Sequence, residues 1–168
     1  MLRRSQLKQA VELWMREGDV SRVYGEVYVH LVWATKGREP VLLPDVRRRL
    51  YEVIRRQCTT IGVDPLAVGG VEDHVHLLVS LPTTVTIAEI ARRVKGATSH
   101  FMSHEAIPGK NFEWQKGYGV FTIHRNSVES VRRYIDRQEE HHRKQSLLRD
   151  LEIVAPEEAP QVEACGLG

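Results

Sequence analysis

The sequence contains little cysteine and no long uninterrupted run of apolar residues. Its 168 residues include only two cysteines, Cys58 and Cys165, whose separation fits neither a disulfide framework nor a zinc site built on paired cysteines. Such sparse usage is typical of a reducing compartment, so we expect a cytoplasmic protein. No apolar stretch approaches the roughly 20 residues needed to cross a bilayer. The basic residues near the N-terminus are not followed by the apolar core of a signal peptide.

Net charge is also small, but it is unevenly distributed. The chain carries a formal charge of +2, and residues 151–168 contain four glutamates and no lysine or arginine. Most of the chain is therefore moderately basic, which permits a partner that carries phosphate groups. A well-solvated surface would explain the same charge, so composition alone does not decide between the two.

The hydrophobic pattern predicts an α+β domain. We expect helices at 2–17, 44–60, 86–104 and 126–149, and strands at 23–34, 63–71, 72–80 and within 112–123. The central βαββαβ order predicts a ferredoxin-like core, in which an antiparallel sheet carries both crossover helices on one face. The last helix is an addition to that core. We expect three parts: an N-terminal amphipathic helix at 1–20, one domain at 21–150 and a poorly ordered acidic tail at 151–168.

Two histidines stand in the third predicted strand. Alternation along a strand places His74 and His76 on the same face, where two imidazoles can share one divalent ion. Glu72 has the same parity and is a candidate further ligand, whereas Asp73 is expected to face the other way. A strand with two half-buried histidines and no metal would have the same sequence.

A second pair of polar residues stands in the last predicted helix. Tyr134 and Gln138 are four residues apart, so they lie one turn apart on the same helix face. A tyrosine hydroxyl beside a metal can attack a phosphodiester, and an amide oxygen can complete the shell of a hard cation. An isolated helical tyrosine more often packs its ring and hydrates its hydroxyl. Tyr118 and Tyr28 are weaker candidates for a nucleophile because packing roles suit both.

Several separated motifs occur in an order that resembles a known family. They are His30-Leu-Val-Trp-Ala-Thr-Lys-Gly-Arg38, Asp73-His-Val-His-Leu-Leu-Val79, Lys95-Gly96, Trp114-Gln-Lys-Gly-Tyr-Gly-Val-Phe121 and Tyr134-Ile-Asp-Arg-Gln-Glu-Glu-His-His142. Together they resemble the single-tyrosine HUH transposases of small insertion sequences, which move as single-stranded DNA. The resemblance spans roughly residues 28–149 and thus most of the domain at 21–150.

This resemblance implies a mechanism and partners. His74, His76 and Gln138 would bind Mg²⁺ or Mn²⁺, and Tyr134 would form a 5′-phosphotyrosine bond and free a 3′-hydroxyl. The enzyme would come from a bacterium or archaeon and would be a homodimer. The tyrosine helix of one subunit can complete the histidine site of the other subunit. The dimer would recognise hairpins in single-stranded DNA at the ends of its element. The loop before that helix, residues 123–126, lacks the glycine that helps it act as a hinge in relatives.

The residues that contact DNA are less sharply indicated. Basic side chains on two predicted helices are candidates to line a groove for the DNA backbone: Arg92, Arg93, Lys95, Arg132 and Arg133. Two other functions stay open. One is a non-catalytic module that binds single-stranded nucleic acid, and the other is a host-adapted nickase with the same chemistry that acts on repeats.

Overall fold

The computed structural model describes residues 25–109, 111–144, 148 and 151–152. The N-terminal helix expected at 2–17 and residues 153–168 of the expected acidic tail lie outside this part of the chain. The described elements are β1 (Tyr28–Ala34), η1 (Lys36–Arg38), α2 (Pro44–Thr60), β2 (Asp64–Gly70), β3 (His74–Ser80), α3 (Ile87–Phe101), η2 (Met102–Ala106), β4 (Gly119–Ile123), η3 (Arg125–Ser127), α4 (Val128–Asp136) and α5 (Gln138–Arg143).

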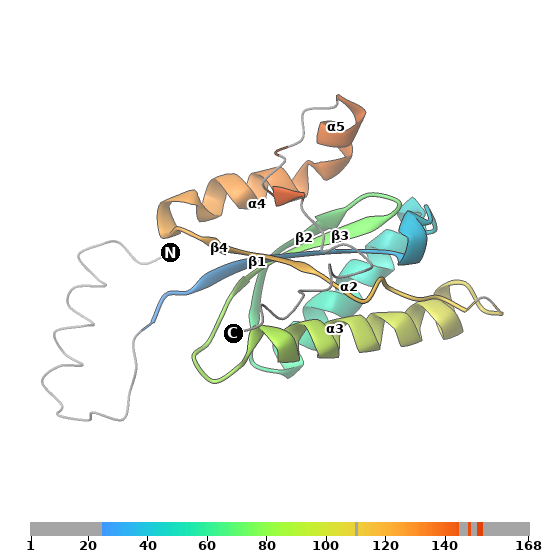
Figure 1. The fold of residues 1–168 in the computed structure, drawn as a ribbon, viewed down its shortest axis with the longest axis horizontal. Helices are drawn as coiled ribbons and strands as arrows, with labels where there is room; N and C mark the ends of the chain where they lie inside the picture. The colour runs from blue at the N-terminus through green and yellow to red at the C-terminus, as the bar shows by residue number, and fades with distance from the viewer. Residues whose placement is uncertain (1–24, 110, 145–147, 149–150, 153–168) are drawn as a thin grey trace, which may run out of the picture.

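The four strands form one antiparallel sheet in the order β2-β3-β1-β4. Helices α2 and α3 cover one face of this sheet, and α4 crosses the other face (Figure 1). The ferredoxin-like α+β architecture expected from the sequence is therefore confirmed, with α4 as the additional element. No helix within the described residues is long and apolar enough to cross a membrane.

Strand alternation separates the core into two parts. Leu31 and Trp33 of β1 and Leu77 of β3 belong to the large cluster under α2 and α3. On the opposite face, Leu78 of β3 belongs to a smaller cluster with Val131, Tyr134 and Ile135 of α4. His74 and His76 have the parity of Leu78, so both imidazoles lie on the α4 face, and the prediction that they share one face is confirmed.

Local signals set the helix starts closely. Pro44 begins α2, and the Thr86 hydroxyl accepts a hydrogen bond from the Glu89 amide at 3.2 Å at the start of α3. The end of the helix expected at 86–104 was predicted less accurately. The α-helical part, α3, ends at Phe101, and a π-helical turn over Met102–Ala106 follows it.

The last helix differs from the sequence prediction of one continuous helix. It is interrupted at Arg137, whose dihedral angles of φ −109° and ψ 21° are not helical, so Tyr134 lies in α4 and Gln138 begins α5. Nothing in the sequence signals this interruption, because the helical spacing of its residues continues across Arg137. The interruption is accompanied instead by a contact with another helix. The guanidinium of Arg47, buried on α2, pairs with Glu139 of α5 at 2.6 Å.

Helix α4 approaches the sheet closely at Gly69 of β2. A Cβ atom at this position would lie 2.2 Å from the backbone oxygen of Ile135 and 2.9 Å from its side chain. A side chain there would therefore push α4 away from the sheet, and with it Tyr134. Glycine at this position is required by the contact between strand and helix.

We expect Gly69→Ala to destabilise the protein by about 1–3 kcal/mol, because overpacking forces the backbone of α4 outward. Gly96→Ala is the matched control, since Gly96 lies within α3 and a Cβ there meets nothing within 4 Å. That control should stabilise by up to about 1 kcal/mol through helix propensity. Urea unfolding measures both changes, and equal effects of the two substitutions would contradict the assigned contact.

Candidate active site

The four residues singled out from the sequence meet on the α4 face of the sheet. His74 and His76 project from β3 and are 1% and 0% exposed. The Tyr134 ring stands perpendicular to the His76 ring, with centroids 6.4 Å apart. Gln138, at the start of α5, is also buried. Strand β3 and helices α4 and α5 of the same chain bring these side chains together.

The orientation of His74 is fixed by an acidic neighbour. Its Nδ1 atom lies 2.6 Å from Oδ1 of Asp73, and Arg38 donates to the other oxygen of that carboxylate at 3.0 Å. A proton on Nδ1 leaves the lone pair on Nε2 directed toward the site. The expectation that Asp73 faces the other way was wrong, because Asp73 precedes β3 in a bend and strand alternation does not apply to it.

The orientation of His76 is fixed by another histidine. Nδ1 of His76 lies 2.9 Å from Nε2 of His30 on the neighbouring strand β1, and the two rings are parallel. Burial and the neighbouring His76 lower the pKa of His30 to about 3, so His30 is neutral and its Nε2 can accept a hydrogen bond from Nδ1–H of His76. With its proton on Nδ1, His76 also presents a bare Nε2 to the site. The sequence analysis assigned His30 no role; only the β1–β3 register, which pairs Val32 with His76, brings it close.

Three of the predicted ligand atoms have no hydrogen-bond partner. Nε2 of His74, Nε2 of His76 and Oε1 of Gln138 are buried and unsatisfied among the described residues. Buried polar atoms are nearly always satisfied, and unsatisfied ones need an explanation such as a missing ion. Two imidazole nitrogens and an amide oxygen suit a divalent cation, so the residues present fit a metal.

A carboxylate from the end of the described chain also reaches this cluster. Oε2 of Glu152 lies 3.2 Å from Nε2 of His74 and 3.4 Å from Nε2 of His76. The ligand atoms of these three residues all lie within 4.8 Å of one another, which makes His74, His76 and Glu152 a candidate metal site. The sequence analysis missed Glu152, which it included in the acidic tail, and no local pattern distinguishes it from Glu157 or Glu158.

The charges in the site influence one another. Burial lowers the pKa of His76, and the nearby Glu152 only partly opposes this effect. Burial acts on His74 in the same way, but contacts with Asp73 and Glu152 outweigh it and raise the pKa of His74. Burial would raise the pKa of Glu152, yet its contacts with the two histidines and Tyr134 hold it far below its usual range. Burial and the hydrogen bond to Glu152 raise the pKa of Tyr134 to about 12.

The family that this geometry suggests also matches by sequence. The profile described as "Transposase IS200 like" matches residues 23–138. The chain belongs to the IS200-like transposase family. It is therefore placed among the proteins of mobile elements and DNA transposition.

Individual relatives agree with this assignment. The chain is 29% identical over 115 residues to the ISDra2 transposase TnpA of Deinococcus radiodurans, which covers 65% of this chain and 81% of that protein. It is 27% identical over 115 residues to the IS200 transposase of Salmonella typhimurium, which covers 65% of this chain and 74% of that protein.

Two solved structures share the fold. A Deinococcus radiodurans R1 protein assigned as a transposase, in a crystal structure at 1.90 Å resolution, superposes with a TM-score of 0.57 at 29% identity and covers 70% of this chain and 94% of its own. A REP-associated tyrosine transposase bound to a REP hairpin superposes with a TM-score of 0.55 at 19% identity and covers 74% of each chain.

The structure also places the weaker candidates from the sequence and one further histidine. Glu72 pairs with Arg47 at 3.5 Å and does not belong to the cluster of ligand atoms. The side chain of Tyr118 packs against the large core cluster on the opposite face. His142, to which the sequence analysis assigned no role, approaches the site, with its ring centroid 4.9 Å from that of His74.

The predicted basic residues divide between the two faces of the sheet. Arg92 and Arg93 form ion pairs with Glu89 on α3, and Nζ of Lys95 donates to the backbone oxygens of Gln115 and Gly117. Arg132 and Arg133 lie on α4, across the sheet (Figure 1). Within one subunit the two sets do not line a common groove.

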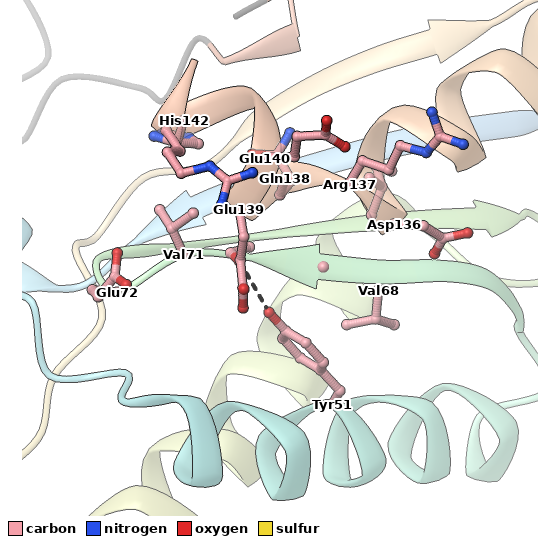
Figure 2. Close-up of a pocket in the computed structure, with 14 residues that line it drawn as sticks. Tyr51, Val68, Val71, Glu72, Asp136, Arg137, Gln138, Glu139, Glu140 and His142 are labelled. Carbon is pink, nitrogen blue, oxygen red and sulfur yellow. Dashed lines mark hydrogen bonds between the residues drawn. The ribbon is translucent and has the colours of Figure 1, made fainter. Parts of the chain in front are cut away.

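A cleft of about 740 Å³ adjoins the site. The α4–α5 junction forms one wall, the end of β2 and Tyr51 of α2 form another, and the Tyr51 hydroxyl donates to the backbone oxygen of Gly70 (Figure 2). Gln138 lines this cleft and also contacts Glu152, so the cleft borders the candidate metal site. Its lining mixes acidic and basic side chains (Figure 2).

We expect His30→Leu to weaken Mn²⁺ binding by roughly 10–100-fold, because the Nδ1 proton of His76 loses its acceptor and the imidazole loses its fixed orientation. His30→Gln offers an amide oxygen as acceptor and should retain most of the affinity. His100→Leu, an exposed histidine on α3, controls for loss of an imidazole. Calorimetric titration with Mn²⁺ measures the three affinities, and an unchanged affinity in His30→Leu would contradict this role.

Proposed function

We propose that this IS200-like transposase cuts and rejoins single-stranded DNA through a covalent bond to Tyr134. One observation carries the proposal: the three buried atoms without hydrogen-bond partners, on His74, His76 and Gln138, converge beside the only tyrosine that the structure, within its described residues, brings to the histidine pair. A cluster of two imidazoles, an amide and a phenol serves phosphodiester chemistry better than it serves packing.

These three side chains would hold Mg²⁺ or Mn²⁺ through their buried nitrogen and oxygen atoms. The ion, when bound, would polarise the scissile phosphate and offset the charge that develops during attack. The protein's own part is orientation. Asp73 and His30 fix the two imidazoles, and the contact of α4 with Gly69 fixes the distance of Tyr134 from the sheet.

In the proposed reaction the phenolic oxygen of Tyr134 attacks phosphorus. A new oxygen–phosphorus bond forms while the bond to the 3′ oxygen breaks, the phenol loses its proton and the departing 3′ oxygen takes one up. The product is a 5′-phosphotyrosine with a free 3′-hydroxyl. This exchange of one phosphoester for another conserves the bond, so attack by the 3′-hydroxyl of another strand rejoins DNA and restores Tyr134 without ATP.

The DNA partner follows from the family resemblance, and we propose single-stranded element ends folded as hairpins. Arg132 and Arg133 stand beside Tyr134 in the sequence and are candidates to contact the DNA backbone there. Arg92 and Arg93 would contact a more distant part of the DNA. We further propose a homodimer in the cytoplasm of a bacterium or archaeon, organised as a domain at 21–150 between an N-terminal helix and an acidic tail.

Two related functions make different predictions. A non-catalytic module on the same fold would bind single strands equally well with EDTA present and would form no covalent adduct; the convergence of the ligand atoms with Tyr134 speaks against it. A host-adapted nickase would share all the chemistry described here. Hairpin-bearing ends that flank the gene would favour transposition of an element over nicking of dispersed repeats.

We expect Tyr134→Phe to abolish the covalent protein–DNA adduct while DNA binding persists, because the substitution removes only the attacking oxygen. Single-stranded oligonucleotides that tile the DNA flanking the gene would be incubated with protein and Mg²⁺, and adducts resolved on denaturing gels. EDTA should also abolish the adduct. Tyr118→Phe is the control and should leave adduct formation intact. Adduct that persists in Tyr134→Phe would refute the nucleophile assignment.

A further inference from the structure

The end of the described chain closes over the nucleophile. The amide of Leu148 donates to the Tyr134 hydroxyl at 3.2 Å, and that hydroxyl donates in turn to Oε1 of Glu152. Leu151 packs against the small core cluster of α4, and its amide bonds the backbone oxygen of Leu148 at 2.8 Å. Leu148, Leu151 and Glu152, here called the C-terminal cap, thus hold the phenol from two sides.

The carboxylate of Glu152 contacts every side chain that the proposed reaction uses. Oε2 lies 3.2 and 3.4 Å from Nε2 of His74 and His76. Oε1 accepts hydrogen bonds from the Tyr134 hydroxyl and, at 3.2 Å, from the Gln138 amide. The Glu152 side chain is 15% exposed, so its carboxylate fills the centre of the site rather than its rim.

A scissile phosphate would need the same space. Attack requires the phenolic oxygen about 3–3.5 Å from the phosphorus. The metal-assisted reaction also requires a phosphate oxygen at the ion held by the two imidazoles. A phosphodiester presents two oxygens that share one negative charge, and so does a carboxylate. Glu152 places one oxygen against the phenol and the other against both imidazoles, as a bound phosphate would.

The low exposure of Tyr134 and the two histidines also indicates that Glu152 and a phosphate cannot occupy the site together. Tyr134 is 4% exposed, and His74 and His76 are 1% and 0% exposed. A phosphate within a DNA strand cannot touch the phenol and the imidazoles together while the cap is in place. Glu152 and the DNA must therefore exclude each other from the site.

We propose that the C-terminal cap is an internal competitor of DNA, in which Glu152 occupies the subsite of the scissile phosphate until a bound strand displaces it. This inference rests on the proposed function for the identity of the competitor. It assigns the beginning of the acidic tail a regulatory role, since entry of DNA and release of the cap are one event. A site that opens only for a strand able to displace the carboxylate would be inactive toward weakly bound DNA.

The first test uses the accessibility of Tyr134 in the full chain and needs no DNA. N-acetylimidazole acetylates exposed phenols, and peptide mass spectrometry would report the extent at Tyr134, with Tyr28 and Tyr118 as internal references. We expect Glu152→Ala and Glu152→Gln to raise acetylation of Tyr134 at least threefold. Glu157→Gln, which makes the same change of charge in the tail, should match the wild type. Unchanged acetylation of Tyr134 in both Glu152 variants would overturn the cap.

The second test measures competition with DNA. With the flanking single-stranded oligonucleotides and Mg²⁺, Glu152→Ala should form adduct several-fold faster at low DNA concentration and converge with the wild type at saturation, because removing a competitor raises apparent affinity. Its Mn²⁺ affinity, from calorimetry, should stay within about threefold of the wild type. A tenfold loss of Mn²⁺ affinity with a parallel loss of adduct would overturn the inference and make Glu152 a required ligand.

The two proposals fail separately. If no oligonucleotide gives an adduct with any variant, yet acetylation of Tyr134 rises in Glu152→Ala, the proposed function fails and the closure of Tyr134 by the cap stands. If the wild type forms adduct and Glu152→Ala shows neither greater acetylation nor faster reaction at low DNA, the cap fails and the proposed function stands.

Discussion

The site depends on the pairing of β1 with β3. This pairing sets Val32 opposite His76 and so brings His30, two residues back on the same face, within hydrogen-bond distance of the His76 ring. Because strand alternation has a period of two, a slip of one residue would turn His74 and His76 toward α2 and α3 and bring Val75 to the α4 face. The apolar residues that alternate with the histidines oppose such a slip, since Val75 and Leu77 belong to the large core cluster. The hydrophobic core thus determines the direction in which the two histidines of the candidate metal site point.

The two faces of the sheet differ in what they carry. One face carries α2 and α3 over the larger core, and the other carries a smaller cluster and the polar site under α4. Few apolar residues hold α4 in place, so individual contacts matter more there than in the main core. Gly69 illustrates this dependence, because the absence of a side chain at one strand position sets how closely α4, which carries Tyr134, approaches the sheet.

Much of this arrangement could be predicted from particular residues. The alternation around His74 and His76, Pro44 at a helix start and the capping pair Thr86 and Glu89 all produced their expected local structure. The features that were missed depend on contacts between distant parts of the chain. The interruption at Arg137 accompanies an ion pair from α2, His30 becomes relevant only through strand register, and Asp73 reaches His74 from a bend. Glu152 is one of several glutamates in an acidic segment, and only its contacts with the two histidines and Tyr134 distinguish it.

The interruption at Arg137 also has a mechanical consequence. A continuous helix would join the phenol and the amide of Gln138 as one rigid rod, so that any rotation of one would displace the other. Here a single non-helical residue separates two short rods, each held by its own neighbour: α4 by the sheet at Gly69, and α5 by the buried guanidinium of Arg47. Under the proposed function, the torsion angles of this one residue would form a joint about which Tyr134, once bonded to DNA, could shift while the Gln138 amide keeps its place.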